Sequence, residues 1–179
     1  MTTKAALATI ADLEQHPGRA ELIHGELIEM SPTGFAHARV TLIIGSLLRT
    51  FVKGHAVPGE VLVGDPGFIW DEQNVRAPDV AYLDAEQVSR APERGFMPFS
   101  PALAIEVVSP GDRWTEVRAK VRGWLAHGTR MVWIVDPCDH TVEVVVLGTA
   151  SPRELTVADT IDGGAVVPGF SVQVSEFFA

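Results

Sequence analysis

Apolar residues recur at helical spacing in two long segments of the chain. In the first segment, residues 37–54, they fall at i, i+3, i+4, i+7, i+8 and i+11. This spacing predicts an amphipathic helix that covers a sheet with one face. Gly45 lies inside the segment, and because glycine weakens a helix by about 1 kcal/mol relative to alanine, we expect close packing there. The apolar positions are Val40, Ile43, Ile44, Leu47, Leu48 and Phe51.

The second helical pattern covers residues 112–127. Its apolar positions fall at i, i+4, i+7 and i+8, and Gly128 follows as a natural helix terminator. The segment is therefore expected to pack one face against a sheet. The apolar positions are Val117, Val121, Trp124 and Leu125.

Short apolar runs between turn-forming residues predict the strands. Residues 21–30 contain two such runs around His24 and Gly25, which predicts a β-hairpin with positive φ at Gly25. Residues 84–101 are polar and rich in turn residues, so we expect a surface excursion with one helical turn. Further strands are expected at residues 60–63, 67–70, 80–83, 103–108, 131–135, 141–147 and 154–157.

The order of these elements predicts the fold class. A hairpin, a helix, several strands, a second helix and more strands favour an α/β (α+β) fold in which helices flank a central mixed β-sheet. A chain of 179 residues suits a single core. We expect an N-terminal lead-in helix over residues 1–20 and a single domain over residues 21–179.

Composition and charge narrow the class of protein. With 46% apolar residues, 21% charged residues and a net charge of −9, the chain is an ordinary globular domain. The acidic balance argues against coating nucleic acid through bulk charge, but not against an enzyme that meets a polyanion at one site. One cysteine, Cys138, excludes an intrachain disulfide framework and a multi-cysteine zinc site. Because no apolar run approaches about 20 residues, we expect a cytoplasmic protein without a membrane partner.

Two carboxylates occupy unusual positions in the predicted strands. Asp79 follows a proline and opens an apolar strand, and Glu106 lies inside an otherwise apolar strand. An ionised carboxylate on a buried strand is costly unless it is paired or binds a metal. If the two strands are neighbours, Asp79 and Glu106 meet at one sheet end and can hold Mg²⁺ or Mn²⁺. The alternatives are a turn-capping role for Asp79, and an exposed or arginine-paired Glu106.

Lys120 lies 14 residues after Glu106 in the second predicted helix. Helical geometry places it at the flank of the buried face, from which it can reach over the end of the sheet. There an ammonium group positions a water or stabilises a developing phosphate charge. The alternative is a solvated contact with Glu116, its i−4 neighbour.

The histidines and the standard catalytic motifs add little. His37 precedes the first long helix and either orients a phosphate or carboxylate or simply begins the helix. The HExxH, GxSxG, Walker and GxGxxG patterns do not occur. Cys138 has no activating neighbour in the sequence and is interpreted as a turn residue.

The order and spacing of four short motifs resemble those of the Uma-two family of restriction endonucleases, within the PD-(D/E)-x-K nuclease superfamily. The resemblance extends from Glu21 to Phe177. The motifs are ELIHGELIEMSPTG, RAPDVAYL, LAIEVVSPGDR and, after the helix with Lys120, AHGTRMVWIVDP.

The resemblance implies a restriction-endonuclease-like core and Mg²⁺-dependent phosphodiester hydrolysis. Asp79 matches the PD aspartate and Glu106 the second acidic ligand. The superfamily lysine usually stands two residues after that acid, where this sequence has Val108. The resemblance therefore implies that Lys120, which lies on the next helix, takes the role of the superfamily lysine. Glu26 matches a glutamate that related nucleases place near the metal; an exposed strand residue is its alternative.

Two hypotheses follow for the function. The first is a metal-dependent endodeoxyribonuclease that cuts DNA, with Asp79, Glu106, Lys120 and Glu26 as its catalytic residues. The second is a weak or inactive nuclease-fold protein that binds nucleic acid or a protein partner. The resemblance also implies a homodimer, which suits cleavage of both strands of a duplex.

The positive charges are concentrated in one segment. Residues 113–130 hold five basic residues against one acidic residue, in a chain that is otherwise negative. We therefore expect Arg113 and Arg118, together with His37, to contact the substrate. Binding at so small a basic patch is expected to be loose and strongly salt-sensitive.

Overall fold

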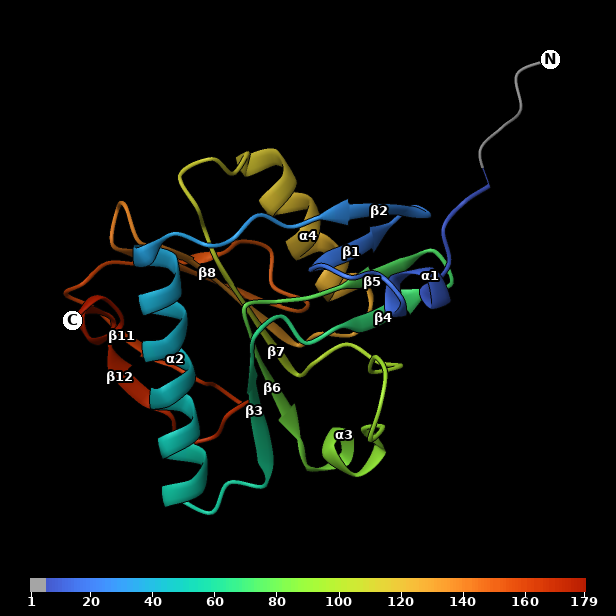
Figure 1. The fold of residues 1–179 in the computed structure, drawn as a ribbon. Helices are drawn as coiled ribbons and strands as arrows, with labels where there is room; N and C mark the ends of the chain where they lie inside the picture. Colours follow the sequence, from blue (N-terminus) through green and yellow to red (C-terminus); the bar gives the residue numbers. More distant parts are fainter. Residues whose placement is uncertain (1–5) are drawn as a thin grey trace.

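A six-stranded mixed sheet forms the centre of the molecule. The computed structural model describes residues 6–179 (Figure 1). The strand order is β10-β9-β8-β7-β6-β3; β7 and β8 pair in parallel, and the other neighbours are antiparallel. The predicted mixed sheet with flanking helices is confirmed. The strands are β3 (Gly59–Val63), β6 (Val80–Asp84), β7 (Leu103–Val107), β8 (Met131–Asp136), β9 (Thr141–Val146) and β10 (Arg153–Leu155).

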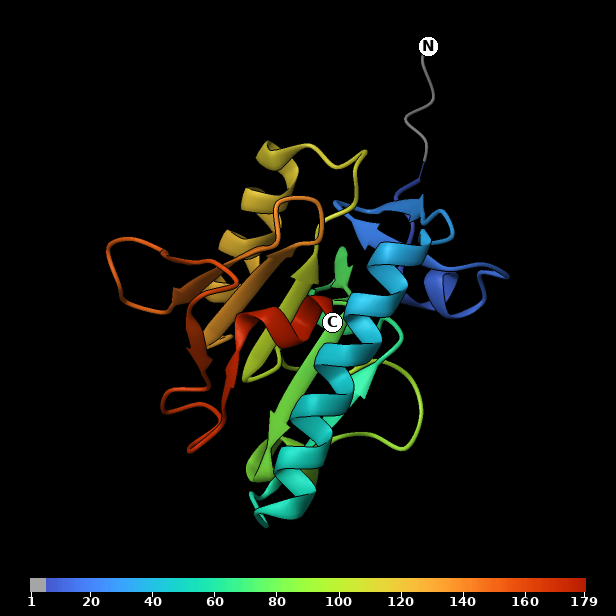
Figure 2. The same cartoon turned by 90° about the vertical axis from the view of Figure 1, so that its left-hand side faces the viewer.

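One face of the sheet is covered by the long helix α2 (Phe35–Gly54) and the C-terminal segment. Figure 2 shows α2 lying along the sheet beside the 3₁₀ helix η1 (Val174–Phe178). A small hairpin of β11 (Thr160–Asp162) and β12 (Ser171–Gln173) leads into η1. Apolar side chains of α2 and alternate side chains of the sheet share one buried core, so the helical spacing correctly predicted the covered face. The α2 members of this core are Val40, Ile44, Leu48 and Val52.

The expected close packing at Gly45 is confirmed. A methyl group placed on Gly45 would lie 2.6 Å from Cγ2 of Val63, on the edge strand β3. Such a distance is well inside van der Waals contact, so the absence of a side chain lets α2 approach the sheet.

The opposite face of the sheet carries α4 (Trp114–Ala126) and a second, four-stranded sheet. Val121 and Trp124 of α4 pack in a core with Ala104 and other alternate residues of the central sheet. The second sheet has the order β2-β1-β5-β4, and the helix α1 (Ile10–Glu14) packs beside it. Its strands are β1 (Ala20–Ile23), β2 (Glu26–Glu29), β4 (Phe68–Asp71) and β5 (Asn74–Arg76).

The predicted N-terminal hairpin is confirmed. β1 and β2 pair with Ile23 opposite Glu26, so the loop has two residues. These are His24 and Gly25, with φ angles of 52° and 74°. A two-residue turn with both φ angles positive matches the twist of the flanking strands.

Several boundaries differ from the sequence-based expectations. α2 begins at Phe35 rather than residue 37, and α4 covers Trp114–Ala126 rather than residues 112–127. β10 begins one residue before the expected segment 154–157 and ends at Leu155. The surface excursion contains α3 (Ala85–Arg90), as expected. Of the lead-in segment, α1 occupies five residues, and residues 1–5 lie outside the described part. The elements β5, β11, β12 and η1 were not predicted, because each has three to five residues and too few positions to show a period.

In the described part of the chain, α2 is the one helix long and apolar enough to span a membrane, by length and composition alone. α2 has 20 residues and contains an 18-residue window with a mean hydropathy of 1.3, but polar residues such as Arg39 and Arg49 interrupt it, so it is not an uninterrupted apolar run. Its side chains nevertheless contribute to the core against the central sheet, as in the core helix of a globular protein.

The contact between Gly45 and Val63 generates a prediction about stability. Gly45→Val is expected to lower the free energy of unfolding by about 2 kcal/mol, because the added side chain overpacks the interface. Ser46→Val, at the exposed next position, is the matched control and should change it far less. Urea unfolding measures both. Val63→Ala added to Gly45→Val should restore part of the loss, and equal stability of the two single variants would contradict the close packing.

Candidate active site

Strand pairing brings Asp79 and Glu106 to the same end of the central sheet. Val80 pairs with Ile105 in the antiparallel β6–β7 ladder, so Asp79 lies beside the end of β7. The Val107 N–H donates to Asp79 Oδ2 at 2.6 Å. Side chains alternate along a strand, and Glu106 lies on the same face as Ala104, the face that α4 covers. The condition set by the sequence, that the two strands are neighbours, is therefore met.

Lys120 reaches the same place from α4. Its ammonium group lies 2.9 Å from Glu106 Oε2 and donates to the Ala77 carbonyl at 2.7 Å. Trp124, one helical turn later, donates from its indole Nε1 to Glu106 Oε1 at 2.6 Å. Glu116 pairs with Arg113 instead. The alternative, a solvated contact between Lys120 and Glu116, therefore does not form.

Glu21 completes the cluster, and the sequence-based reasoning missed it. From strand β1 its carboxylate accepts from the Ala77 N–H at 2.8 Å and the Arg76 Nε–H at 2.9 Å, and lies 3.2 Å from the Lys120 ammonium. The signal was present, because Glu21 stands beside apolar residues in a predicted strand, as Glu106 does. The strand neighbour that supplies Arg76 could not be read from the sequence.

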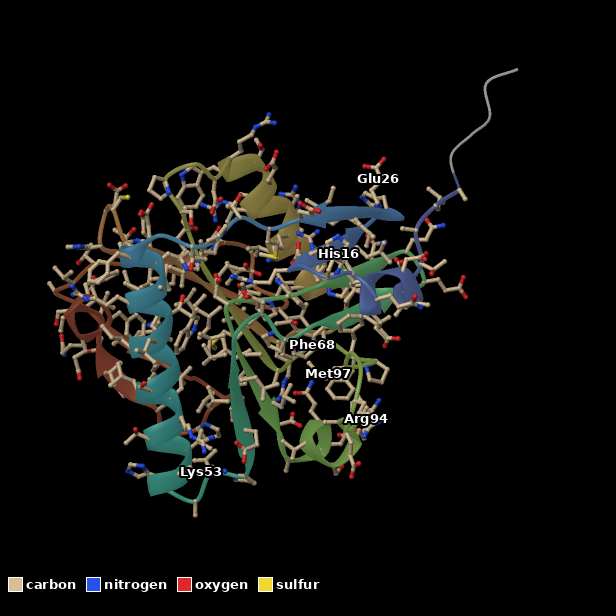
Figure 3. The ribbon with its side chains drawn as sticks, in the orientation of Figure 1. His16, Glu26, Lys53, Phe68, Arg94 and Met97 are labelled. Atoms are coloured by element: carbon tan, nitrogen blue, oxygen red, sulfur yellow. The ribbon has the colours of Figure 1, made fainter. Side chains whose placement is uncertain are left out.

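Glu26, the glutamate predicted near the metal, lies elsewhere. It is exposed at the start of β2, and Figure 3 shows it on the outer side of the hairpin. It does not line the pocket described below. The structure therefore brings together Asp79, Glu106 and Lys120 with Glu21, and does not bring Glu26 to them. The physical reason is strand alternation combined with the two-residue turn, which leaves Glu26 on the solvent side.

His37 contacts Asp79 from the first turn of α2. Its Nε2 lies 3.1 Å from Asp79 Oδ1, and its ring is buried. Burial acts to lower the pKa of His37, but the hydrogen bond to Asp79 and the nearby negative charges outweigh it, so the pKa is raised. The imidazole thus adds positive charge beside the carboxylate when it is protonated.

Burial and the charge of neighbouring groups shift the pKa values of Glu106, Lys120 and Glu21 in opposite directions. Burial raises the pKa of Glu106 to about 7, helped by Asp79 and Glu21 and opposed by Lys120. Burial also acts to lower the pKa of Lys120, but Glu106 and Glu21 hold it above its usual value. For Glu21, burial is outweighed by Lys120 and Arg76, and its pKa is lowered. Glu106 is therefore the carboxylate of this cluster that takes up a proton most readily near neutral pH.

A pocket of about 570 Å³ opens over this cluster. Its walls are two loops, residues 30–34 before α2 and residues 108–113 before α4. Figures 1 and 2 show that both helices begin at the same end of the molecule. Neither helix has a side-chain hydrogen bond at its N-cap. The free N–H groups and the positive dipole ends therefore lie at the pocket, an arrangement that favours an anion.

The two arginines expected to contact substrate differ in placement. Arg113 lines the pocket and is exposed. Arg118 instead pairs with Glu143 of β9 and packs over the Trp114 ring, and it does not line the pocket. Arg130 likewise pairs with Asp84. The basic segment seen in the sequence is therefore largely neutralised by ion pairs.

The donor set is compatible with a hard divalent cation. Three carboxylates, Asp79, Glu106 and Glu21, face Lys120 and Arg76, which leaves a formal excess of one negative charge when His37 is neutral. Within residues 6–179, no group of three or more His, Cys, Asp or Glu side chains is arranged to hold a metal. Asp79 and Glu106 are the two carboxylates of this cluster that line the pocket, and Mg²⁺ commonly takes one or two carboxylates together with water and phosphate oxygens.

The buried cluster generates a prediction about stability and pH. Glu21→Gln should lower the free energy of unfolding at pH 7 by about 3 kcal/mol, because Lys120 and Arg76 lose a buried counter-ion. The pKa of Glu21 is lowered in the folded state, so its contribution is present above the unfolded pKa of about 4.3 and is lost as the pH falls further. Urea unfolding at several pH values should show the difference between the variant and the unchanged protein shrinking in acid.

The matched control is Glu26→Gln in the same hairpin, which should leave stability nearly unchanged because Glu26 is exposed. Equal losses in the two variants would contradict the role of Glu21.

Comparison with solved structures gives a close match in fold. A structure described as "Crystal structure of a putative nuclease belonging to DUF820 from Anabaena variabilis" superimposes with a TM-score of 0.80. The match covers 95% of this chain and 97% of that chain, at 19% sequence identity. At this identity, the likeness shows a shared fold.

Comparison with sequence families gives a match over nearly the whole chain. The sequence model of the Uma2 family, described as "Putative restriction endonuclease", matches residues 7–175. A comparison with curated protein sequences finds no match. The resemblance read from the motifs is confirmed, and the chain belongs to the Uma2 family of restriction-endonuclease-like proteins.

Proposed function

We propose that the protein is a metal-dependent endonuclease that hydrolyses phosphodiester bonds of DNA. The observation that carries the proposal is the meeting of Asp79, Glu106 and Lys120 at one pocket, from three elements that are distant in sequence. Membership of the family and the nuclease fold support it. A carboxylate in a cleft whose pKa is strongly raised, as that of Glu106 is, is also typical of functional sites.

Asp79 and Glu106 are the residues that would hold Mg²⁺ or Mn²⁺. Each ionised carboxylate has about four lone-pair positions, and the contacts to the Val107 N–H, His37, Lys120 and Trp124 leave some of these unused. When bound, the ion would lower the pKa of a water ligand and polarise the phosphate. The Val107 and Trp124 hydrogen bonds fix the two carboxylates in place before substrate arrives.

Lys120 is proposed to position the attacking water or to offset charge on the scissile phosphate. An ammonium group has three N–H donors, and three acceptors surround this one: Ala77, Glu106 and Glu21. Lys120 must therefore give up one of these contacts in order to reach a substrate. Val108, which occupies the usual lysine position, is buried against α4 and carries no charge.

Phosphate contacts are proposed at the two helix N-termini. The free N–H groups of α2 and α4 supply positive potential without a net charge, and Arg113 adds one exposed cation beside them. His37 holds Asp79 and adds charge when protonated. Binding through so few charges is expected to be weak and salt-sensitive. The homodimer and the cytoplasmic location stay predictions.

A second candidate function rests on the observation that three acceptors already surround the three N–H donors of Lys120. If Lys120 keeps all three of its contacts, it acts as a structural counter-ion, and the pocket binds nucleic acid or a protein partner without cutting. Cleavage and metal binding separate the two candidates.

The nuclease proposal predicts metal-dependent cleavage. Plasmid and labelled oligonucleotides should be cut with Mg²⁺ or Mn²⁺ and not with EDTA. Asp79→Asn should reduce the rate at least about 100-fold, because a carboxylate that holds the ion is lost. Glu26→Gln, purified in parallel, should cut at the unchanged rate, which shows that the loss in Asp79→Asn is specific to its position; loss of cleavage in Asp79→Asn also excludes a contaminating nuclease. Equal cleavage by Asp79→Asn would refute the assignment.

The proposed cation site also predicts a calorimetric signature. Mn²⁺ should bind the unchanged protein and bind much more weakly to Glu106→Gln. Because burial raises the pKa of Glu106 to about 7, binding at about pH 6 should release about one proton, and binding at about pH 8 almost none. Titrations in buffers of different ionisation enthalpy measure the release. Absence of binding at millimolar Mn²⁺ favours the candidate that does not cut.

A further inference from the structure

Glu21 differs from the other two carboxylates of the cluster in where it faces. Asp79 and Glu106 line the pocket, and Glu21 does not. Its exposed fraction is 6%. Burial acts to raise the pKa of Glu21, but Lys120 and Arg76 outweigh it and hold the pKa below its usual value, so the carboxylate is ionised at neutral pH. A buried charge that does not line the pocket is not placed to contact a substrate or a metal ion there.

The Glu21 carboxylate instead holds two parts of the site at once. Its Oε1 atom accepts from the Ala77 N–H at 2.8 Å and lies 3.2 Å from the Lys120 ammonium. Its Oε2 atom accepts from the Arg76 Nε–H at 2.9 Å. The Ala77 carbonyl in turn accepts from Lys120 at 2.7 Å. Glu21, Ala77 and Lys120 therefore form a closed triangle of contacts, in which each member touches the other two.

A stiff piece of backbone connects this triangle to Asp79. Only Pro78 stands between Ala77 and Asp79. Proline fixes its own φ angle and confines the residue before it to extended conformations. Both backbone polar groups of Ala77 are held, the N–H by Glu21 and the carbonyl by Lys120. The triangle therefore fixes the direction in which the chain leaves Ala77 and presents Asp79 to the pocket.

The triangle also sets the position of the Lys120 ammonium. Its contacts with the Ala77 carbonyl at 2.7 Å and with Glu106 at 2.9 Å are the shorter two, and the contact with Glu21 at 3.2 Å is the longest. The two short contacts hold the ammonium at the end of the sheet. The longest contact is the one that Lys120 can exchange most readily for a water or a phosphate oxygen, so Glu21 aligns the ammonium until that exchange.

We propose that Glu21 is a positioning residue of the nuclease site, which holds Lys120 and the backbone ahead of Asp79 in place without contacting the metal or the substrate. The inference rests on the proposed function. It gives a part in the reaction to the N-terminal hairpin, whose residues 20–29 do not line the pocket. A catalytic group that is misplaced by about 1 Å can lower the rate about 100-fold. A residue that fixes two such groups should therefore affect the rate of reaction more than the affinity for the metal.

The first test separates rate from metal binding in Glu21→Gln. Glutamine keeps the shape and one acceptor oxygen, but its amide nitrogen cannot accept a hydrogen bond, so one of the three surrounding donors loses its partner. The single-turnover rate of DNA cleavage at saturating Mn²⁺ should fall at least about tenfold. The dissociation constant for Mn²⁺, measured by calorimetry, should rise less than about fivefold, because the oxygen ligands of Asp79 and Glu106 remain. Glu106→Gln, titrated in parallel, should lose most of its Mn²⁺ affinity.

A second test asks whether Glu21 acts through Lys120. The triangle is already open when Lys120 is removed. Glu21→Gln added to Lys120→Gln should therefore lower the single-turnover rate by less than about threefold beyond Lys120→Gln alone. Two independent defects would instead multiply. The paired variant removes one positive and one negative buried charge together, which costs less stability than leaving one charge unpaired. It thus keeps the inference testable even if Glu21→Gln alone does not fold.

A control variant separates positioning from general loss of stability. Leu155 is buried in the core on the face of the central sheet opposite to Glu106, and it does not line the pocket. Leu155→Ala should lower the free energy of unfolding, as truncation of a buried leucine does, and should cut DNA at the unchanged rate. Urea unfolding of every variant identifies conditions under which all of them are folded, and the rates are compared there.

The outcomes distinguish failure of the inference from failure of the proposed function. A rate in Glu21→Gln within about threefold of normal, with cleavage still dependent on Asp79, overturns the inference and leaves the nuclease proposal standing. Loss of Mn²⁺ affinity in Glu21→Gln as large as that in Glu106→Gln also overturns it, because Glu21 is then a metal ligand. An equal loss of rate in Leu155→Ala, or multiplied losses in the paired variant, overturns it as well. Absence of metal-dependent cleavage by the unchanged protein overturns both proposals.

Discussion

The buried contact between Glu106 and Lys120 is the interaction on which the site depends. It joins the central strand β7 to the helix α4, and Glu21 extends it to the N-terminal hairpin. Removing any one member leaves a charge in a place with little access to water, which is far more costly than losing a surface pair. The same charges that organise the site thus also fix how α4 and the second sheet are seated on the central sheet.

This arrangement explains how the pocket can favour an anion without being strongly basic. The carboxylates are held by specific donors: the Val107 N–H for Asp79, and the Trp124 indole together with Lys120 for Glu106. Helix N-termini supply further positive potential through backbone groups that add no net charge. An overall acidic protein is therefore compatible with a local site for an anionic substrate.

Much of the core and part of the site could be predicted from the sequence, because they depend on local periodicity. The spacing in α2 and α4 identified their buried faces, and an isolated carboxylate in the apolar strand β7 identified Glu106. Glu21 was missed because its partners Arg76 and Lys120 come from elements 55 and 99 positions away, and β5, which brings Arg76 near, has three residues. The pairing of Arg118 with Glu143 of β9 was equally invisible, since a sequence shows a charge but not its distant partner.

The site draws its charged groups from strand β1, the segment before β6, strand β7 and helix α4, spread over about a hundred residues of chain. Contacts between such distant segments carry a high loop-closure cost and form only as the whole domain folds. While the chain is being synthesised, Glu21, Asp79 and Glu106 remain separate and hydrated, each with the ordinary properties of an exposed carboxylate. A polypeptide released before α4 is complete lacks Lys120 and Trp124 and has no assembled pocket. The topology therefore delays the assembly of the site until the chain has been synthesised beyond α4.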